Sequence, residues 1–167
     1  LVSKSTSDFD SGDTLINTYS DQKNGAASAY INFNQDKLSA NLKYGQSFDK
    51  TTTYDSRSPQ GNTFDTTQKQ LNFQLGYKLP VGQLIAGLEH LKQEADVNAN
   101  YAIYDLDRTV KSLFTSYLVT QNNFDFQAGV RQDDHSEYDK HTSYNIGGAY
   151  RINPTTRLGL AYSTGFK

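Results

Sequence analysis

Three aspartates lie close together near the start of the chain, and their spacing could suit a metal ion. Asp8, Asp10 and Asp13 are set among serine, threonine and glycine residues. Carboxylate oxygens are the hard ligands that calcium prefers in proteins, so these residues are candidate ligands of a partial calcium site. A solvated acidic loop is the simpler interpretation of the same composition.

The densest group of titratable side chains lies between residues 133 and 141. It consists of Asp133, Asp134, His135, Glu137, Asp139 and His141. An Asp–His pair could activate a water molecule, and the same residue types could bind a metal ion. A hydrated loop whose charges face water explains the cluster more simply. Phosphate-binding glycine loops, serine nucleophile elbows and zinc-type histidine spacings are absent, so we expect no enzyme and no catalytic residue.

Tyrosines and aspartates are also paired in two other polar stretches. Tyr54 and Asp55 form the first pair, and Tyr101, Tyr104 and Asp105 form the second group. Tyrosine is a rigid amphipathic side chain that stacks on ligands and donates hydrogen bonds, so these residues are candidates for binding a large substrate. Exposed tyrosines in polar loops need no ligand, and that alternative stays open.

The elements that would position these residues are strands with two unlike faces. Leu38, Ala40, Leu42 and Tyr44 alternate with polar residues, and residues 71–78 repeat the pattern. A period of two is the signature of a strand with one apolar face. The strands that contain these runs are expected to have about ten residues, which is longer than most globular strands and matches a tilted strand that crosses a bilayer. The pattern therefore predicts an all-β protein made of antiparallel transmembrane β-barrel strands.

About eight such strands can be placed in an up-and-down meander, and residues 1–24 are expected to form a loop with a strand beginning near Leu15–Tyr19. The gaps between strands are alternately short and long, and the short ones contain the Asn, Asp, Gly and Pro residues that favour tight turns. The expected strands are Gly25–Asn34, Leu38–Phe48, Gln68–Lys78, Gln83–Gln93, Thr109–Thr120, Phe124–Gln132, Ser143–Ile152 and Thr156–Thr164.

Composition agrees with a wall that touches lipid on one side only. The mean hydropathy is −0.72 and 35% of the 167 residues are hydrophobic, yet 13% are aromatic. The net charge of −2 gives no basis for nucleic-acid binding, and the absence of cysteine excludes disulfides. No run of 18 apolar residues is present, so no transmembrane helix is expected. A soluble β-sandwich with an aromatic core is the alternative fold.

Short turns on one side and long loops on the other are how outer-membrane barrels are built, with the short turns in the periplasm. Eight strands arranged this way would place both ends of the chain on the extracellular side, whereas a complete barrel should have them on the periplasmic side. We therefore expect a segment of a larger barrel. The alternative is a self-contained eight-stranded outer-membrane protein, acting as an adhesin or as a hydrolase with a site at its rim.

The last third of the chain resembles the vitamin B12 (cobalamin) transporters among the TonB-dependent outer-membrane receptors. The match extends from Val130 to Lys167, and the rest of the chain agrees in strand spacing only. The matching residues are Arg131, Asp133, Asp134, Ser136, Tyr138, His141, Thr142, Gly148, Tyr150 and the run Tyr162-Ser163-Thr164-Gly165-Phe166-Lys167. The pattern departs from the family at Asp139, where a glycine is usual, so a sister siderophore or haem receptor stays open.

The resemblance implies a barrel of about 22 strands closed by a plug domain. It implies cobalamin or a similar large ligand on the extracellular side, TonB as the energy-supplying partner, and lipid of a Gram-negative outer membrane around the wall. Calcium-ordered extracellular loops would fit this family, although no cofactor is required. We expect residues 1–167 to be barrel wall without a plug. The inward polar set would contact that plug: Asn41, Lys43, Asn72, Gln74, Lys78, Gln127 and Arg131.

Overall fold

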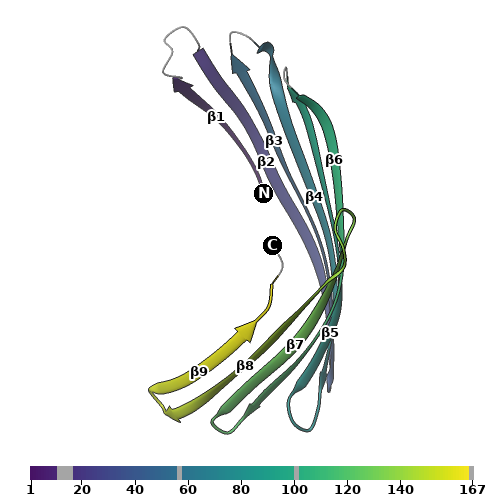
Figure 1. Cartoon of the computed structure of the whole chain (residues 1–167), viewed down its shortest axis with the longest axis vertical. Helices are drawn as coiled ribbons and strands as arrows, with labels where there is room; N and C mark the ends of the chain where they lie inside the picture. Colours follow the sequence, from purple (N-terminus) through teal and green to yellow (C-terminus); the bar gives the residue numbers. More distant parts are fainter. Residues whose placement is uncertain (11–16, 56–57, 100–101, 166–167) are drawn as a thin grey trace. The chain divides into compact units, whose positions relative to one another are not determined.

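The computed structural model describes residues 1–10, 17–55, 58–99 and 102–165. They form a single nine-stranded sheet in which each strand pairs with the next one along the chain, so that β1 and β9 are its two edges (Figure 1). The strands are β1 (Val2–Asp10), β2 (Asn17–Gln35), β3 (Leu38–Asp55), β4 (Ser58–Lys78), β5 (Gln83–Ala99), β6 (Ala102–Gln121), β7 (Phe124–His135), β8 (His141–Asn153) and β9 (Thr156–Ser163).

The first strand was not expected from the sequence, and the expected count of about eight was one too low. Residues 1–24 contain all of β1 and the first part of β2. The two strands pair antiparallel from Val2 opposite Gly25 to Asp10 opposite Asn17. β1 is almost entirely polar, so it lacks the apolar alternation that marks a strand in a sequence. Backbone hydrogen bonds form a ladder regardless of side-chain polarity.

Most strands are also much longer than predicted. β4 has 21 residues and β6 has 20. Two of the stretches expected to be long loops, 49–67 and 94–108, are largely occupied by strand, and 133–142 is strand at both ends with a connection at 136–140. Apolar periodicity marks only the part of a strand that has an apolar face, and the polar continuation keeps the same backbone geometry without that signal. The predicted strands other than the last therefore correspond to sections of longer ones.

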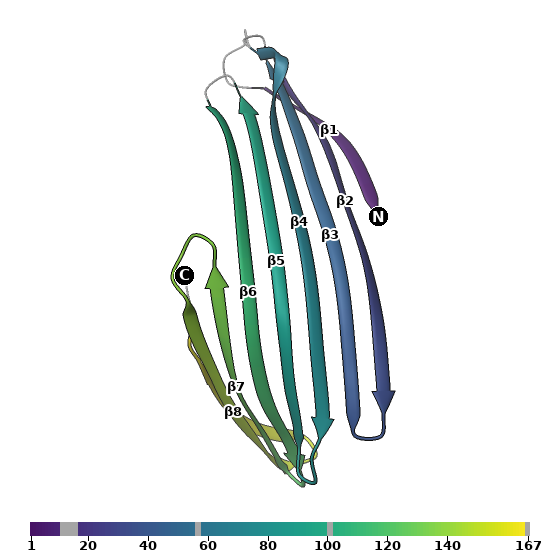
Figure 2. The ribbon, with the colours of Figure 1, turned by 90° about the vertical axis from the view of Figure 1, so that its right-hand side faces the viewer.

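The short turns are where the sequence predicted them. Asp36, in the turn between β2 and β3, has φ 48°, and Asn122, in the turn between β6 and β7, has φ 54°. Asn and Asp tolerate this left-handed conformation better than other side chains do. Figure 2 shows the β2–β3 and β4–β5 turns at the same end of their strands. This is the side that carries the short connections in outer-membrane barrels.

Alternation along the strands separates two kinds of surface, and no second sheet covers either one. Across β6 and β7, Phe114 is opposite Arg131 on one face, while Val119 is opposite Phe126 on the other. The apolar side chains are exposed, and Leu160 in β9 reaches 81%. A sandwich requires two packed sheets, so the described residues do not fit that alternative. They also contain no helix that is both long and apolar enough to cross a membrane.

The chain divides into two compact units. Unit 1 consists of Leu1–Ala29, Tyr44–Gln70 and Leu91–Thr109. Unit 2 consists of Tyr30–Lys43, Leu71–His90 and Val110–Lys167. The apolar residues identified in the sequence at 71–77 lie in unit 2, and the polar continuations of β3, β4 and β5 lie in unit 1.

Gly82 in the β4–β5 turn provides a test of this turn geometry. It has φ 82°, and a Cβ there would meet the carbonyl oxygen of Leu118. Gly82→Ala should lower the free energy of unfolding by about 2 kcal/mol, because an L side chain is strained in that conformation and has no room. The measurement is chemical unfolding of the protein in detergent micelles.

Gly159→Ala in β9 is the matched control, because its nearest neighbour would be Ala149 Cβ at 3.5 Å, an ordinary contact. It should change the free energy of unfolding by less than about 0.5 kcal/mol. Equal stability of the two variants would contradict the assigned turn conformation.

Candidate functional site

The most organised group of polar side chains in unit 2 surrounds Arg131 of β7. The Arg131 Nε donates to Asp133 at 2.8 Å, and its Nη2 donates to the Ser112 hydroxyl at 2.7 Å and to Glu89 at 3.2 Å. Ser112 in turn donates to Asp133 at 2.5 Å. The guanidinium also lies 6.0 Å from the centroid of the Phe114 ring. We call these five residues the Arg131 network, and they join β5, β6 and β7 on one face of the sheet.

The network is partly buried and carries an excess of negative charge. Ser112 is only 4% exposed, and the side chains of Glu89 and Asp133 are each 19% exposed. Two carboxylates therefore share a single guanidinium in a region that water reaches poorly. Charge-assisted hydrogen bonds are stronger than neutral ones, so this arrangement fixes the relative positions of the side chains.

A hollow of about 430 Å³ lies beside the network. Arg131 and Glu89 line it together with amide-bearing residues and one lysine from neighbouring strands. The polar lining residues are Asn41, Lys43, Asn72, Gln74, Glu89, Ser116, Arg131 and Asn145. Five of the seven residues expected to face inward, namely Asn41, Lys43, Asn72, Gln74 and Arg131, line this hollow. Amide and guanidinium groups offer both donors and acceptors, so the surface suits a polar partner.

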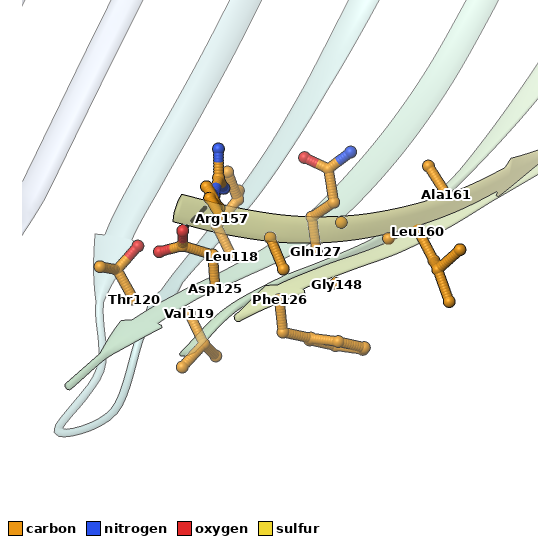
Figure 3. A pocket seen from close by; sticks show the side chains of 13 residues that line it. Leu118, Val119, Thr120, Asp125, Phe126, Gln127, Gly148, Arg157, Leu160 and Ala161 are labelled. Atoms are coloured by element: carbon orange, nitrogen blue, oxygen red, sulfur yellow. Dashed lines mark hydrogen bonds and ion pairs between the residues drawn. The ribbon is translucent and has the colours of Figure 1, made fainter. Parts of the chain in front are cut away.

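A second hollow, of about 640 Å³, is formed where small residues leave β8 and β9 without bulky side chains. Gly147, Ala149, Gly159 and Ala161 line it, beside an ion pair in which Arg157 donates to Asp125 at 2.7 Å. Figure 3 shows Gln127 of β7 and Arg157 of β9 projecting from one side of the sheet, and Val119 of β6 and Phe126 of β7 from the other. The polar and the apolar faces are therefore separate here as well.

The candidate substrate-binding residues are in strands rather than in loops. Tyr54 and Asp55 are the last residues of β3, and Tyr104 and Asp105 lie within β6. The Tyr54 ring stacks on Tyr19 of β2, with centroids 4.8 Å apart and an interplanar angle of 18°. No ring contact or ion pair joins Tyr54 to Tyr104 or Asp105 among the residues whose side chains are described. Tyr101 lies outside the described residues.

Two of the three candidate calcium ligands also belong to a strand. Asp8 is opposite Tyr19 and Asp10 is opposite Asn17 in the β1–β2 ladder, so the predicted loop does not exist at these positions. Asp13 lies outside the described residues. Within residues 1–10, 17–55, 58–99 and 102–165, no group of three acidic or histidine residues is placed to hold a metal ion. Calcium binding stays a prediction.

The dense titratable cluster is divided by the structure. Asp133 belongs to the Arg131 network, whereas Asp134 pairs with Lys140 at 3.1 Å near the end of β7. His135 makes an edge-on contact with the Tyr138 ring, with centroids 6.2 Å apart. Asp133 and Asp134 lie on opposite faces of β7, so these neighbouring acids have different partners. Asp133 is directly opposite His141 in the β7–β8 register, so the structure brings this Asp–His pair to one face of the sheet.

Sequence reasoning missed Glu89, Ser112 and Phe114 as members of a site. Their signal is positional rather than compositional. Glu89 is the only acidic residue on the polar side of the strand predicted at 83–93. Ser112 and Phe114 are opposite Asp133 and Arg131 in the β6–β7 register, and that register is not visible in a sequence until the strands are aligned.

A family model for the TonB dependent receptor-like β-barrel matches residues 2–167. The chain belongs to this family. Its place is therefore the outer membrane of a Gram-negative bacterium, where the apolar sheet face meets lipid. The receptor and transport proteins of this family are not generally enzymes.

Solved structures with the same fold include several outer-membrane transporters. The RagAB peptide transporter is 16% identical over 89% of this chain, with a TM-score of 0.66. The FrpB iron transporter of Neisseria meningitidis is 12% identical over 97%, with a TM-score of 0.68, and the siderophore receptor PirA of Pseudomonas aeruginosa is 12% identical over 87%, with a TM-score of 0.55. This receptor chain spans 23%, 35% and 36% of their respective lengths.

The Arg131 network gives a prediction for this receptor chain. Arg131→Met leaves two poorly hydrated carboxylates without their cation, so it should lower the free energy of unfolding by about 1–3 kcal/mol. Arg157→Met is the control. Its ion pair with Asp125 is more exposed, at 57% and 26% of the side chains, and should cost about 1 kcal/mol or less.

The two variants are compared by chemical unfolding in detergent micelles. Adding Glu89→Gln to Arg131→Met should recover part of the lost stability, because one of the unpaired charges is removed. A loss no greater than that of Arg157→Met, or no recovery in the double variant, would show that the Arg131 network does not act as a unit.

Proposed function

We propose that this chain forms part of the barrel wall of a TonB-dependent transporter that takes up a large substrate, cobalamin, across the outer membrane. The observation that carries the proposal is the polar sheet face with the Arg131 network and its adjoining hollow of about 430 Å³. A barrel of this family has a polar interior and an apolar exterior, and the two faces of this sheet differ in the same way.

The partner of the polar face in this proposal is a plug domain carried elsewhere in the protein. The Arg131 network has one more negative than positive charge, and Asn41, Asn72 and Gln74 lie beside it. Lys43 lines the same hollow and balances that charge, so in the proposal these groups hydrogen-bond the backbone of the plug. TonB would then act on the plug, as family membership leads us to expect.

The substrate assignment rests on the resemblance of residues 130–167 to cobalamin transporters. Within that stretch, Arg131 donates a hydrogen bond to Asp133 on the polar face of β7. Tyr138 lies in the connection between β7 and β8, and His141 is the first residue of β8. In the proposal, Tyr54, Asp55, Tyr101, Tyr104 and Asp105 contact the ligand on the extracellular side, and calcium orders the segment containing Asp8, Asp10 and Asp13.

A siderophore or haem receptor is the alternative within the same family. The similar structures include proteins described as a peptide transporter, an iron transporter and a siderophore receptor. At 12–16% identity these structures support the fold alone. The transported ligand is identified by binding measurements.

The test is binding of labelled cobalamin to the full receptor in detergent, with unlabelled cobalamin, a ferric siderophore, haem and a mixed peptide pool as competitors. We expect saturable binding that only unlabelled cobalamin displaces. Tyr104→Ala should weaken binding about tenfold, because a stacked aromatic contact is lost, whereas Tyr150→Ala, at an exposed position in β8, should not change it.

Absence of cobalamin binding, together with saturable binding of one of the other ligands, would reject the substrate and keep the transporter. Failure of energised cells to accumulate any of these ligands would reject the transport function.

A further inference from the structure

The outward face of unit 1 carries one lysine on each of five consecutive strands. Lys4 is directly opposite Lys23 across β1 and β2. Lys23 lies 6.0 Å from the centroid of the Phe48 ring of β3, and Lys50 follows Phe48 by two residues, on the same face. Lys69 in β4 and Lys92 in β5 both contact Glu94, at 3.5 and 2.7 Å. We call these five residues the lysine row.

Each lysine occupies an equivalent position along its own strand. In β3, β4 and β5 the side chains on the apolar face, followed away from the short turns, are uncharged until a lysine is reached, apart from His90. The last large apolar residues before these lysines are Phe48, Leu71 and Leu88. In β2 the same face is uncharged from Phe33 to Gly25 and then presents Lys23. In β2 to β5 the row therefore marks the edge of the lipid-facing part of the strand, and Lys4 of β1 lies directly opposite Lys23.

Carboxylates follow the lysines rather than preceding them. On the same face, Asp21 comes after Lys23, Asp65 after Lys69 and Glu94 after Lys92, each farther from the short turns. Lys50 pairs with Asp65 at 2.8 Å, and Lys92 pairs with Asp107 at 3.2 Å. A surface whose lysines and carboxylates served only solubility would not need this fixed order of positive and then negative charges. A layer of positive charge against the apolar band, with negative charge beyond it, matches an anionic lipid headgroup at the boundary of the acyl chains.

The ion pairs distinguish two parts of the row. Three of the lysines already have acidic partners: Lys50 pairs with Asp65, and Lys69 and Lys92 both pair with Glu94. The hydrogen bond from Lys92 lowers the pKa of Glu94, and the charge of Lys69 lowers it further. Lys4 and Lys23 have no ion pair among the described side chains. Asp21, the nearest acid along β2, accepts a hydrogen bond from Thr6 at 2.8 Å. Like charges directly opposite across a sheet repel each other, so this pair lacks an anion.

We propose that Lys4 and Lys23 bind a phosphate group of lipopolysaccharide in the outer leaflet, with the rest of the lysine row lying along the same phosphate layer. The assignment rests on the orientation in the proposed function, in which the short turns are periplasmic and the opposite strand ends are extracellular. Both lysines are exposed on the sheet face that meets lipid. The lipid A part of lipopolysaccharide carries its phosphates where its acyl chains end, which is the depth of the row.

The experiment measures binding of lipid A to the full receptor, purified in detergent and stripped of lipid, by native mass spectrometry. The test variant is Lys4→Gln with Lys23→Gln. The control is Lys37→Gln with Arg151→Gln, which removes the same charge at positions in or next to the short β2–β3 and β8–β9 turns. Lysines near an anionic membrane surface each strengthen attraction by about fivefold, so the test variant should bind lipid A about tenfold more weakly or worse, and the control should bind as the unchanged receptor does.

Two further arms define the chemistry. Dephosphorylated lipid A should bind the unchanged receptor and the test variant equally weakly, and Lys4→Arg with Lys23→Arg should restore binding of phosphorylated lipid A. Unchanged lipid A binding in the test variant, or an equal loss in the control, would overturn the proposal. If the double glutamine variant fails to fold, Lys23→Gln alone is measured and should weaken binding about fivefold.

This assay does not involve the transported ligand. Lipid A binding with no cobalamin binding would reject the substrate and keep the lysine row as a lipid site. Cobalamin uptake, together with unchanged lipid A binding in the Lys4 and Lys23 variant, would reject the lysine row as a lipid site and keep the transport function.

Discussion

The structure depends on one constraint, which is that every backbone N–H and C=O group in contact with lipid must find a partner within the protein. β2 to β8 meet it by pairing on both sides with their neighbours in sequence order, whereas β1 and β9, the edges of the described sheet, are paired on one side. Backbone pairing leaves the side chains free to alternate, so a single sheet can face hydrocarbon on one side and a polar interior on the other. The exposed Leu160 and the partly buried Ser112 are consequences of the same ladder.

The polar face uses that freedom to build a network that the backbone alone would not provide. Arg131 connects Glu89 of β5, Ser112 of β6 and its own neighbour Asp133. These contacts cross three strands, so they hold the side chains of the lumen in fixed positions while the backbone ladder holds the strands. On the apolar face the charged residues are instead confined to the polar ends of the strands, where the lysine row of unit 1 begins.

How far the fold can be predicted from the sequence depends on where apolar residues mark it. Residues 38–44 and 71–77 identify their strands and faces at once, and Asp36 and Asn122 identify two turns. β1 and the outer part of β4 could not be found this way, because their ladders consist of polar residues with no apolar period. For the candidate site, the polar set around Asn41 and Arg131 was predictable from alternation. Its closure by Glu89 and Ser112 was not, because it requires the exact register between the neighbouring strands β5, β6 and β7.

The tight turns have a consequence for how such a sheet can form. The turns after β2, β6 and β8 contain two residues each, so the strands they join begin to pair across a very small loop. Closing a small loop costs little chain entropy, and a hairpin can form in about 1–10 μs. Each new strand can then add to an edge that already exists. A chain built this way can assemble from local hairpins in sequence, without a search for distant partners.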